Sequence, residues 1–168
     1  MKKIGLIYSF NSNKTAKVAD KIREEFKDAP IEAINAESIT EDQFRQFDNL
    51  ILGVPTWFDG ELPNYWDEFG PALEDMDLKG KLVALYGLGD QIGYPENFLD
   101  AVGIMAYLLE SRGAKIVGKT SIEVYTFESS KAQQNDKFLG LAIDFENQAS
   151  KNKDRIKEWV KQLGTEFK

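Results

Sequence analysis

The chain has 168 residues, of which 42% are hydrophobic and 29% charged, with a formal net charge of −7. This length and composition predict one compact domain over residues 1–168, and the negative charge argues against a nucleic-acid binder. The absence of Cys and His excludes disulfides, thiolate metal sites and imidazole-based triads, and no apolar run is long enough for a secretory signal or a membrane span, so we expect a cytoplasmic protein.

Apolar runs alternate with segments of helical periodicity. Runs typical of buried parallel strands occupy residues 3–8, 30–34 (the weakest), 49–54, 81–87 and 114–118. Between and after them, apolar side chains recur at helical spacing in three segments: Val18, Ile22 and Phe26; Phe98, Val102, Ala106 and Leu109; Ile156, Trp159, Val160 and Leu163. This alternation predicts a doubly wound α/β fold, in which ligands bind outside the carboxyl ends of the strands.

The loop after the first strand, "SFNSNKT" at residues 9–15, is polar and leads into a helix. Free N–H groups at that helix start, the hydroxyls of Ser9, Ser12 and Thr15, and the Lys14 ammonium would suit an anion such as a phosphate. The alternative is a solvated loop with an ordinary cap. The loop is not a Walker motif, because the flanking glycines are missing.

Two later loops carry large aromatic side chains. Trp57 follows the run at 49–54 in "GVPTWFDGELPNYWDEF", and Tyr94 follows the run at 81–87 in "GLGDQIGYPENF". We expect both rings to be exposed at the end of the sheet that carries the anion loop, where they would fit a planar, phosphorylated ligand. Taken singly, Trp57 could instead cover the core, and Tyr94 could be a turn residue beside Pro95.

The acidic residues are concentrated in the middle of the chain. No basic residue lies between Arg45 and Lys79, while the interval contains eight acids, including Glu61, Asp67 and Glu68. These charges predict a surface that attracts a basic partner. A solvated helix face is the alternative.

These motifs resemble those of the flavodoxins, specifically the long-chain group. The similarity covers "PTWFDGELPNYW", "GLGDQIGYPENF" and "YTFESSKAQQNDKFLGLAIDFENQ" (125–148), and it extends over almost the whole chain. It implies a five-stranded parallel sheet of order 2-1-3-4-5 with helices on both faces. It also implies that the block at 125–148 interrupts the fifth strand, which residues 139–143 resume.

The resemblance further implies non-covalent FMN binding. Trp57 and Tyr94 would stack on opposite faces of the flavin ring, Asp90 would bond its pyrimidine edge, Thr56 would close the ribityl side, and a rotating peptide at Asp59–Gly60 would offer a carbonyl. The full set of cofactor-binding residues implied is Ser9, Asn11, Ser12, Asn13, Lys14, Thr15, Pro55, Thr56, Trp57, Phe58, Asp59, Gly60, Gly87, Leu88, Gly89, Asp90 and Tyr94.

The phosphate loop departs from the family pattern Thr-x-Thr-Gly-x-Thr. Phe10 stands at the first hydroxyl position and Asn13 at the glycine position. Asn tolerates left-handed backbone, so Asn13 can keep the turn, but Phe10 cannot donate a hydrogen bond to a phosphate. Ser9 or Lys14 would then take over that contact.

The function implied is a low-potential one-electron carrier, monomeric and not an enzyme. Its partners would be redox proteins such as ferredoxin–NADP reductase or photosystem I, docking near Glu61, Asp67 and Glu68. One alternative is a flavodoxin-like FMN-dependent NAD(P)H:quinone reductase. A response-regulator-like module is the other, but it needs a phosphoacceptor Asp after the third strand, where this chain has Pro55 and Thr56.

Overall fold

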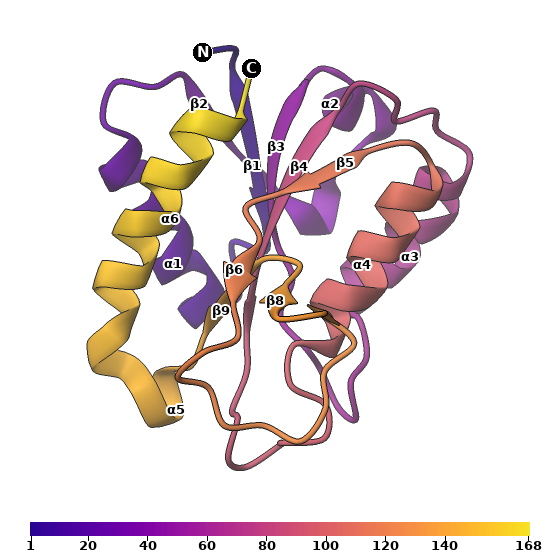
Figure 1. Ribbon diagram of the computed structural model, residues 1–168. Helices are drawn as coiled ribbons and strands as arrows, with labels where there is room; N and C mark the ends of the chain where they lie inside the picture. Colours follow the sequence, from indigo (N-terminus) through magenta and orange to yellow (C-terminus); the bar gives the residue numbers. More distant parts are fainter.

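A parallel sheet forms the centre of the computed structural model, which describes residues 1–168 (Figure 1). Its strand order is β2-β1-β3-β4-β5, and β9 also pairs with β4. The strands are β1 (Ile4–Tyr8), β2 (Ile31–Asn35), β3 (Asn49–Gly53), β4 (Leu82–Leu88), β5 (Lys115–Val117) and β9 (Leu141–Ile143). The predicted fold class and strand order are confirmed, with strand ends within two residues of the runs in the sequence.

The fifth position of the sheet is shared by two short strands. Residues 115–117 of β5 pair with the first half of β4, and residues 141–143 of β9 pair with its second half. The expected interruption of the fifth strand is therefore present. It begins after β5, and it contains the small antiparallel strands β6 (Thr120–Ser121), β7 (Gln133–Gln134) and β8 (Lys137–Phe138).

Helices cover both faces of the sheet (Figure 1). On one face, α1 (Asn13–Phe26) and α6 (Asn152–Glu166) pack side by side over a core of 17 buried residues that includes Val18, Ile22 and Trp159. On the other, α2 (Glu41–Arg45), α3 (Asn64–Glu74) and α4 (Asp100–Ser111) enclose a core of 29 that includes Phe44 and Trp66. The central strands β1, β3 and β4 therefore face apolar side chains on both sides, which explains their nearly continuous apolar sequences.

Four short helical segments complete the chain: η1 (Ala36–Ser38), α2, α5 (Phe145–Gln148) and η2 (Ala149–Lys151). The helix α2 was not predicted from the sequence, because five residues are too few to show helical periodicity. A capping box marks its start, since the Thr40 side chain accepts from the Gln43 N–H and the Gln43 side chain accepts from the Thr40 N–H. No helix is long and apolar enough to cross a bilayer.

The insertion between β5 and β9 is packed against the body of the protein. Tyr125, Phe127 and Phe138 form an aromatic cluster with Phe98, whose ring centroid lies 5.6 to 5.9 Å from theirs. The Tyr125 hydroxyl donates to the Ala142 carbonyl of β9 at 2.6 Å. These contacts hold the insertion beside the loop that follows β4.

Candidate functional site

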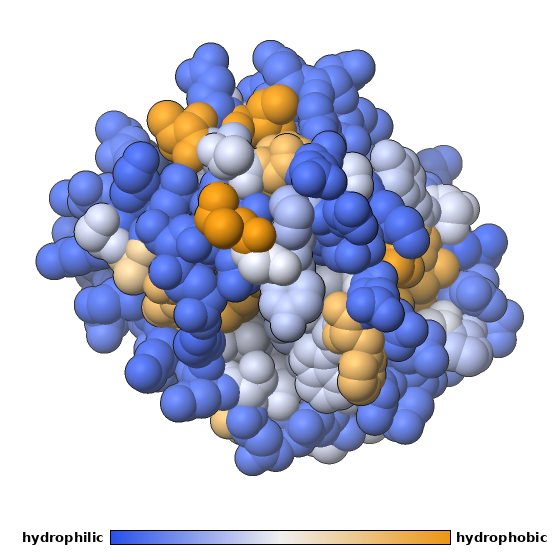
Figure 2. All heavy atoms as spheres, turned by 90° about the horizontal axis from the view of Figure 1, so that it is seen from below, coloured by the Kyte–Doolittle hydropathy of each residue, from blue (hydrophilic) through white to orange (hydrophobic).

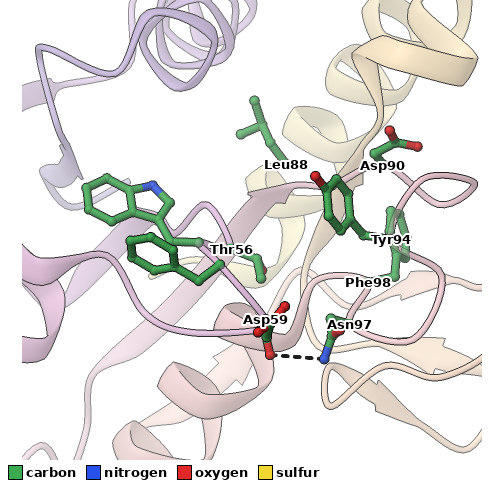
Figure 3. A pocket seen from close by; sticks show the side chains of 10 residues that line it. Thr56, Asp59, Leu88, Asp90, Tyr94, Asn97 and Phe98 are labelled. Atoms are coloured by element: carbon green, nitrogen blue, oxygen red, sulfur yellow. Dashed lines mark hydrogen bonds between the residues drawn. The ribbon is translucent and has the colours of Figure 1, made fainter.

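A cleft of about 670 Å³ opens at the carboxyl ends of the central strands (Figure 3). Because β1, β3 and β4 are adjacent and parallel, the loops that follow them emerge at one edge of the sheet. The cleft is lined by eight of the predicted site residues and by two more, Asn97 and Phe98; the eight are Thr56, Trp57, Phe58, Asp59, Leu88, Gly89, Asp90 and Tyr94. The edge predicted to bind a ligand is thus the edge that carries the cleft.

Trp57 forms one wall of the cleft, and it is partly buried rather than exposed as we expected. The Tyr65 ring of α3 packs edge-on against it, with centroids 5.8 Å apart and planes at 88°. Its backbone pairs with Glu61, since the Trp57 N–H donates to the Glu61 carbonyl at 2.9 Å and the Glu61 N–H donates back at 2.7 Å. These contacts fix the orientation of the Trp57 ring.

Tyr94 stands on the opposite wall and is 64% exposed, as predicted. Figure 3 shows its ring across the cleft from the two unlabelled aromatic rings of the other wall. The Tyr94 N–H donates to the Asp90 carbonyl at 2.9 Å, which closes a turn beneath the ring. The two expected aromatic walls are therefore present on either side of one cleft.

The Asp90 carboxylate organises the loop that carries Tyr94. Its Oδ1 accepts from the Gly93 N–H at 2.7 Å, from Asn147 Nδ2 at 2.8 Å and from the Ile92 N–H at 3.1 Å. These donors, Gly93 first and then Asn147, hold the pKa of Asp90 below its ordinary value. A fixed negative charge consequently lies in the cleft wall at neutral pH.

A buried hydrogen-bond network around Asp144 anchors the loop that carries Tyr94. This network was not predicted from the sequence. The fully buried Asp144 carboxylate accepts from Gln91 Nε2 at 2.8 Å and from the Gln91 N–H at 3.1 Å, and the Asn147 N–H donates to it at 3.0 Å. Gln91 Oε1 in turn accepts from the Thr126 N–H of the insertion at 2.5 Å. The one available signal was an acid placed directly after the apolar run 139–143.

The loop after β1 leads directly into the start of α1. Ser12 occupies the N-cap position, but no side chain caps the helix, because the Ser12 hydroxyl donates instead to Thr15 Oγ1 at 2.8 Å. The N–H groups of the first turn have no intrahelical acceptor, and they carry the positive end of the helix dipole. Free N–H groups of this kind bind anions at helix N-termini, and the anion site at this loop stays a prediction.

Lys14 and Phe10 lie differently from the other members of this loop. The Lys14 ammonium forms an ion pair with Glu146 at 2.6 Å and lies 5.8 Å from the Phe145 ring centroid. Phe10 is 48% exposed, and its ring lies 5.0 Å from that of Tyr8. The Lys14 ammonium is therefore already paired with the Glu146 carboxylate. This pairing argues against the expectation that Lys14 replaces the hydroxyl missing at Phe10.

The remaining predicted residues support the cleft without lining it. Asn11 holds the loop after β1, since its Nδ2 donates to Glu37 at 2.6 Å and its N–H donates to the Ser9 hydroxyl at 3.3 Å. Pro55 and Gly87 are buried beneath the cleft. A Cβ on Gly87 would lie 2.5 Å from a Val102 methyl, so only glycine fits there.

The turn at residues 57–61 has unusual backbone and one side-chain anchor. Phe58 and Gly60 have φ angles of 47° and 99°. The Asp59 carbonyl accepts from Asn97 Nδ2 at 3.1 Å, and the same Nδ2 donates to Asp100 Oδ2 at 3.1 Å. The resemblance implied a peptide at Asp59–Gly60 that rotates at low cost, and that stays a prediction; in this structure the Asp59 carbonyl is hydrogen-bonded to Asn97.

The surface around the cleft is acidic with isolated apolar patches. Figure 2 shows this edge from below, where hydrophobic groups lie among hydrophilic ones. The three exposed apolar side chains of the cleft loops are Phe58 (74%), Ile92 (61%) and Tyr94 (64%). The segments 57–61 and 88–98 contain four acids and no base: Asp59, Glu61, Asp90 and Glu96.

Comparison with known proteins identifies the family. The flavodoxin family model matches residues 6–159. The flavodoxin of a Nostoc species is 45% identical over 99% of this chain and 98% of its own length, and that of Trichodesmium erythraeum is 46% identical over 99% of both. The crystal structure of Fusobacterium nucleatum flavodoxin bound to flavin mononucleotide superposes with a TM-score of 0.95 at 34% identity, covering 100% of both chains. The chain therefore belongs to the flavodoxin family.

Proposed function

We propose that this chain binds FMN without a covalent link and acts as a low-potential one-electron carrier between redox proteins, not as an enzyme. The observation that carries this proposal is the cleft itself, which has Trp57 and Tyr94 on opposite walls. An uncapped helix start follows the neighbouring strand. A planar ring and a phosphate joined by a short chain fit this arrangement. The FMN bound by the Fusobacterium relative supports the choice of cofactor.

Each group of residues has a separate task in binding. Trp57 and Tyr94 stack against the ring and keep water from its faces. The first-turn N–H groups of α1, with the hydroxyls of Ser12 and Thr15, hold the phosphate. Thr56 accepts from the Ala101 N–H at 3.1 Å, so its hydroxyl is fixed where the ribityl chain would pass.

The charges around the cleft favour a low potential. FMN supplies one-electron chemistry when it is bound. An added electron places negative charge between two electron-rich rings, close to the ionised Asp90 and the exposed Asp59. Like charges at this range raise the free energy of the reduced state.

The test is a titration of apoprotein with FMN, followed by stepwise chemical reduction. We expect a yellow 1:1 complex that accepts its two electrons in separable steps, with riboflavin binding at least tenfold more weakly because it lacks the phosphate. No binding of FMN would overturn the proposal. Rapid steady-state turnover of NAD(P)H with a quinone would favour the reductase alternative.

We also propose the partners, based on the resemblance and on the charges. Exposed Glu61, Asp67 and Glu68 lie on and just after the turn at 57–61, at one side of the cleft. They would steer a basic reductase such as ferredoxin–NADP reductase, or a basic docking surface of photosystem I, to that side. We further propose that the protein is a cytoplasmic monomer of the long-chain group. The insertion before β9 supports the assignment to that group. Electron transfer should slow as salt screens these charges.

A further inference from the structure

We propose that a cavity between α6 and the segment that follows β5 is a second binding site, for a small organic acid with an apolar body, and that Arg155 binds its carboxylate. The cavity has a volume of about 540 Å³ and is lined mainly by residues of the segment 120–125 and of α6 (Figure 1). No residue lines both this cavity and the cleft that holds Trp57 and Tyr94. The two sites can therefore be tested separately.

The Arg155 guanidinium has no acidic partner. It takes part in none of the ion pairs of the chain. Its Nη1 atom is buried and has no hydrogen-bond acceptor, while its Nη2 donates to Gln148 Oε1 at 2.6 Å. A buried donor without an acceptor costs free energy, and the cost is larger for a charged group. A ligand that supplies an acceptor for Nη1 would remove that cost.

The guanidinium is held in place from two sides. Its Cζ lies 4.2 Å from the centroid of the Tyr125 ring, within the range of a cation–π interaction. Gln148, which accepts from Nη2, donates in turn from its Nε2 to the Val124 carbonyl at 2.7 Å. These contacts fix the plane of the guanidinium. A fixed, planar guanidinium suits a carboxylate, whose oxygens lie in one plane.

The turn that borders this cavity is strained. Val124 has a φ of 63°, in the left-handed region, and its side chain is 66% exposed. For a β-branched residue such a φ is an outlier. Strain of this kind persists only where surrounding contacts impose it, and it is concentrated at functional sites such as ligand clamps. The Gln148 hydrogen bond is one such contact, and it joins the strained turn to Arg155.

The walls of the cavity suit an apolar ligand body. Val124, Tyr125, Leu141 and Trp159 contribute apolar surface to it. The volume of about 540 Å³ far exceeds the roughly 30 Å³ that one water molecule occupies, and it lies within the range of small-molecule sites. A single bound water would therefore leave most of the cavity and its apolar walls without contacts.

The charges of the cavity favour a ligand with one negative charge. Arg155 and Lys161 contribute two positive charges, and Glu123 and Glu158 contribute two negative ones. A phosphate monoester carries nearly two negative charges at neutral pH, so the two acids would repel it more strongly than a carboxylate. The chemical class that fits is thus a monocarboxylic acid with an aromatic or aliphatic body.

The experiment titrates isotope-labelled, FMN-saturated protein with phenylacetate and follows the backbone amide shifts by NMR. Phenylacetamide, which has nearly the same shape and no charge, is the matched control ligand. We expect saturable shifts in residues 120–125 and 155–165, with a dissociation constant of about 1 mM or tighter. Phenylacetamide should bind at least about tenfold more weakly, because it cannot form a charge-assisted hydrogen bond with Arg155.

Two variants assign the binding to Arg155. Arg155→Met keeps a long side chain beside Tyr125 but removes the charge, so the affinity for phenylacetate should fall at least about tenfold. Arg112→Met is the matched control, because Arg112 follows α4 on the other face of the sheet, where its Nε donates to the Met76 carbonyl at 3.0 Å. Glu158→Gln removes a repelling charge at an exposed position and should strengthen phenylacetate binding about twofold.

Several results would overturn the proposal. One is the absence of saturable shifts in residues 120–125 and 155–165 at millimolar phenylacetate, and another is shifts confined to the cleft segments 56–59 and 88–98. Equal affinities of the wild type for phenylacetate and phenylacetamide would also overturn it, and this comparison needs no variant to fold. The same holds for an unchanged affinity for phenylacetate in folded Arg155→Met.

Discussion

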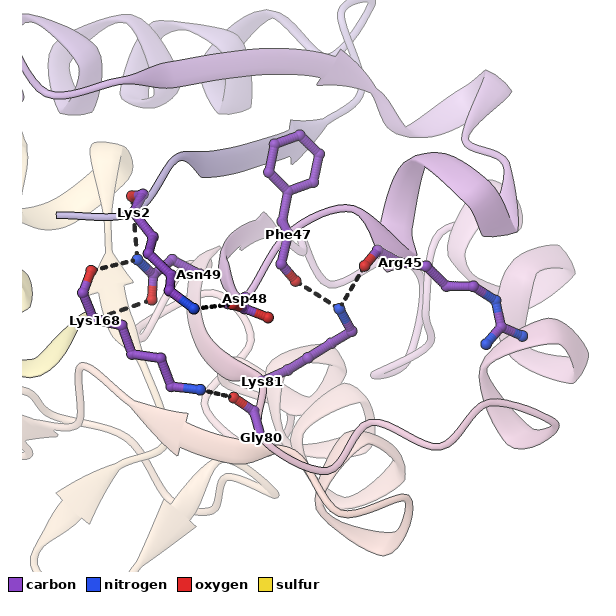
Figure 4. Close-up of polar contacts among 8 residues, drawn as sticks. All are labelled: Lys2, Arg45, Phe47, Asp48, Asn49, Gly80, Lys81 and Lys168. Atoms are coloured by element: carbon purple, nitrogen blue, oxygen red, sulfur yellow. Dashed lines mark hydrogen bonds and ion pairs between the residues drawn. The ribbon is translucent and has the colours of Figure 1, made fainter.

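The two ends of the sheet differ in which groups their loops leave exposed or without a hydrogen-bond partner. At the amino ends of the strands, Asn49 and Lys81 are buried, and each is hydrogen-bonded to backbone (Figure 4). Asn49 Nδ2 donates to the carbonyls of Lys2 at 3.3 Å and Lys168 at 3.1 Å, while its Oδ1 accepts from the Lys168 N–H at 3.1 Å. Lys81 Nζ donates to Phe47 O at 2.6 Å and Arg45 O at 3.0 Å.

At the carboxyl ends, the buried Asp144 is likewise paired, but the loops that border the cleft leave several groups exposed or without a partner within the chain. The start of α1 has no side-chain cap, Tyr94 and Phe58 are exposed, and Phe58 is strained. Stability and ligand binding are therefore divided between the two ends of the sheet. Groups that would cost free energy in a purely structural loop are gathered where a ligand can satisfy them.

The largest expected effect breaks the amino-end network. Asn49→Ala removes the amide partner of the Lys2 carbonyl and of the Lys168 N–H, while the Lys168 carbonyl keeps the Lys2 N–H as a donor. The loss should lower the free energy of unfolding by roughly 3 kcal/mol. FMN affinity should not change, because the residue lies at the opposite end of the sheet. Urea unfolding of the apoprotein and an FMN titration measure the two quantities. The control is Asn64→Ala, at an exposed position on α3, which should not change the free energy of unfolding. An equal loss of stability in this control would refute the structural role assigned to Asn49.

The next largest effect concerns the pH dependence of stability, and it tests whether the insertion between β5 and β9 unfolds together with the rest of the domain. Burial raises the pKa of Tyr125 to about 12. The Tyr125 hydroxyl therefore loses its proton near pH 10 in the unfolded chain but only near pH 12 in the folded one. The contribution of this hydroxyl to the free energy of unfolding is fully present below pH 10 and is lost as the pH rises toward 12. A shift of two units corresponds to roughly 2 to 3 kcal/mol.

The measurement is urea unfolding at intervals from pH 8 to pH 11.5, in the wild type and in Tyr125→Phe. The variant should lose less stability above pH 10. Burial lowers the pKa of Lys81, which makes stability rise with pH below about 10.5. That contribution is common to both proteins and cancels in the difference. Identical alkaline slopes would show that the insertion detaches before the domain unfolds.

The two aromatic walls should respond differently to truncation. Tyr94→Ala should weaken FMN binding about tenfold, since the ring loses its stacking and the area it buries on the ligand. The stability of the apoprotein should be unchanged, because Tyr94 is exposed. Trp57→Ala should weaken binding similarly and also destabilise the apoprotein by about 1 to 2 kcal/mol, because Trp57 packs on Tyr65. Equal apoprotein stabilities, measured by thermal unfolding, would contradict the difference in burial.

The sequence predicted the sheet well because buried parallel strands carry a local signal. The runs at 3–8 and 49–54 correspond to β1 and β3, in which every residue is buried. Resemblance to a family, rather than any local signal, identified the interruption before β9, since a three-residue strand has no pattern of its own. The short α2 was missed for the same reason.

The sequence predicted eight of the ten residues that line the cleft, but not the contacts among them. The partial burial of Trp57 depends on Tyr65, which reaches it only after α3 has packed on the sheet. Asn97 and the Asp59 carbonyl are 38 residues apart, and Gln91 and Asp144 are 53 apart. Periodicity reports only neighbours along the chain, so contacts of this kind cannot be predicted from a single sequence.

The smallest expected effect concerns the one charge of the anion loop that already has a partner. Lys14 and Glu146 are 53% and 55% exposed, so the pair contributes at most about 1 kcal/mol to stability. Glu146→Gln frees the ammonium beside the uncapped start of α1, where it would add to the positive potential. FMN affinity should rise by roughly twofold to fivefold at low salt, and the affinity for riboflavin should not change.

The matched control is Glu24→Gln, which breaks the similarly exposed Lys21–Glu24 pair farther along α1. It should leave the affinities for both ligands unchanged. In Lys14→Ala the affinity for FMN should fall by less than about fivefold, and adding Glu146→Gln to that variant should produce no further rise. A rise that persists without Lys14 would mean that the Glu146 carboxylate itself repels the phosphate. In that case the anion site consists of backbone N–H groups and hydroxyls alone, and the ammonium belongs with the paired charges that serve only the fold.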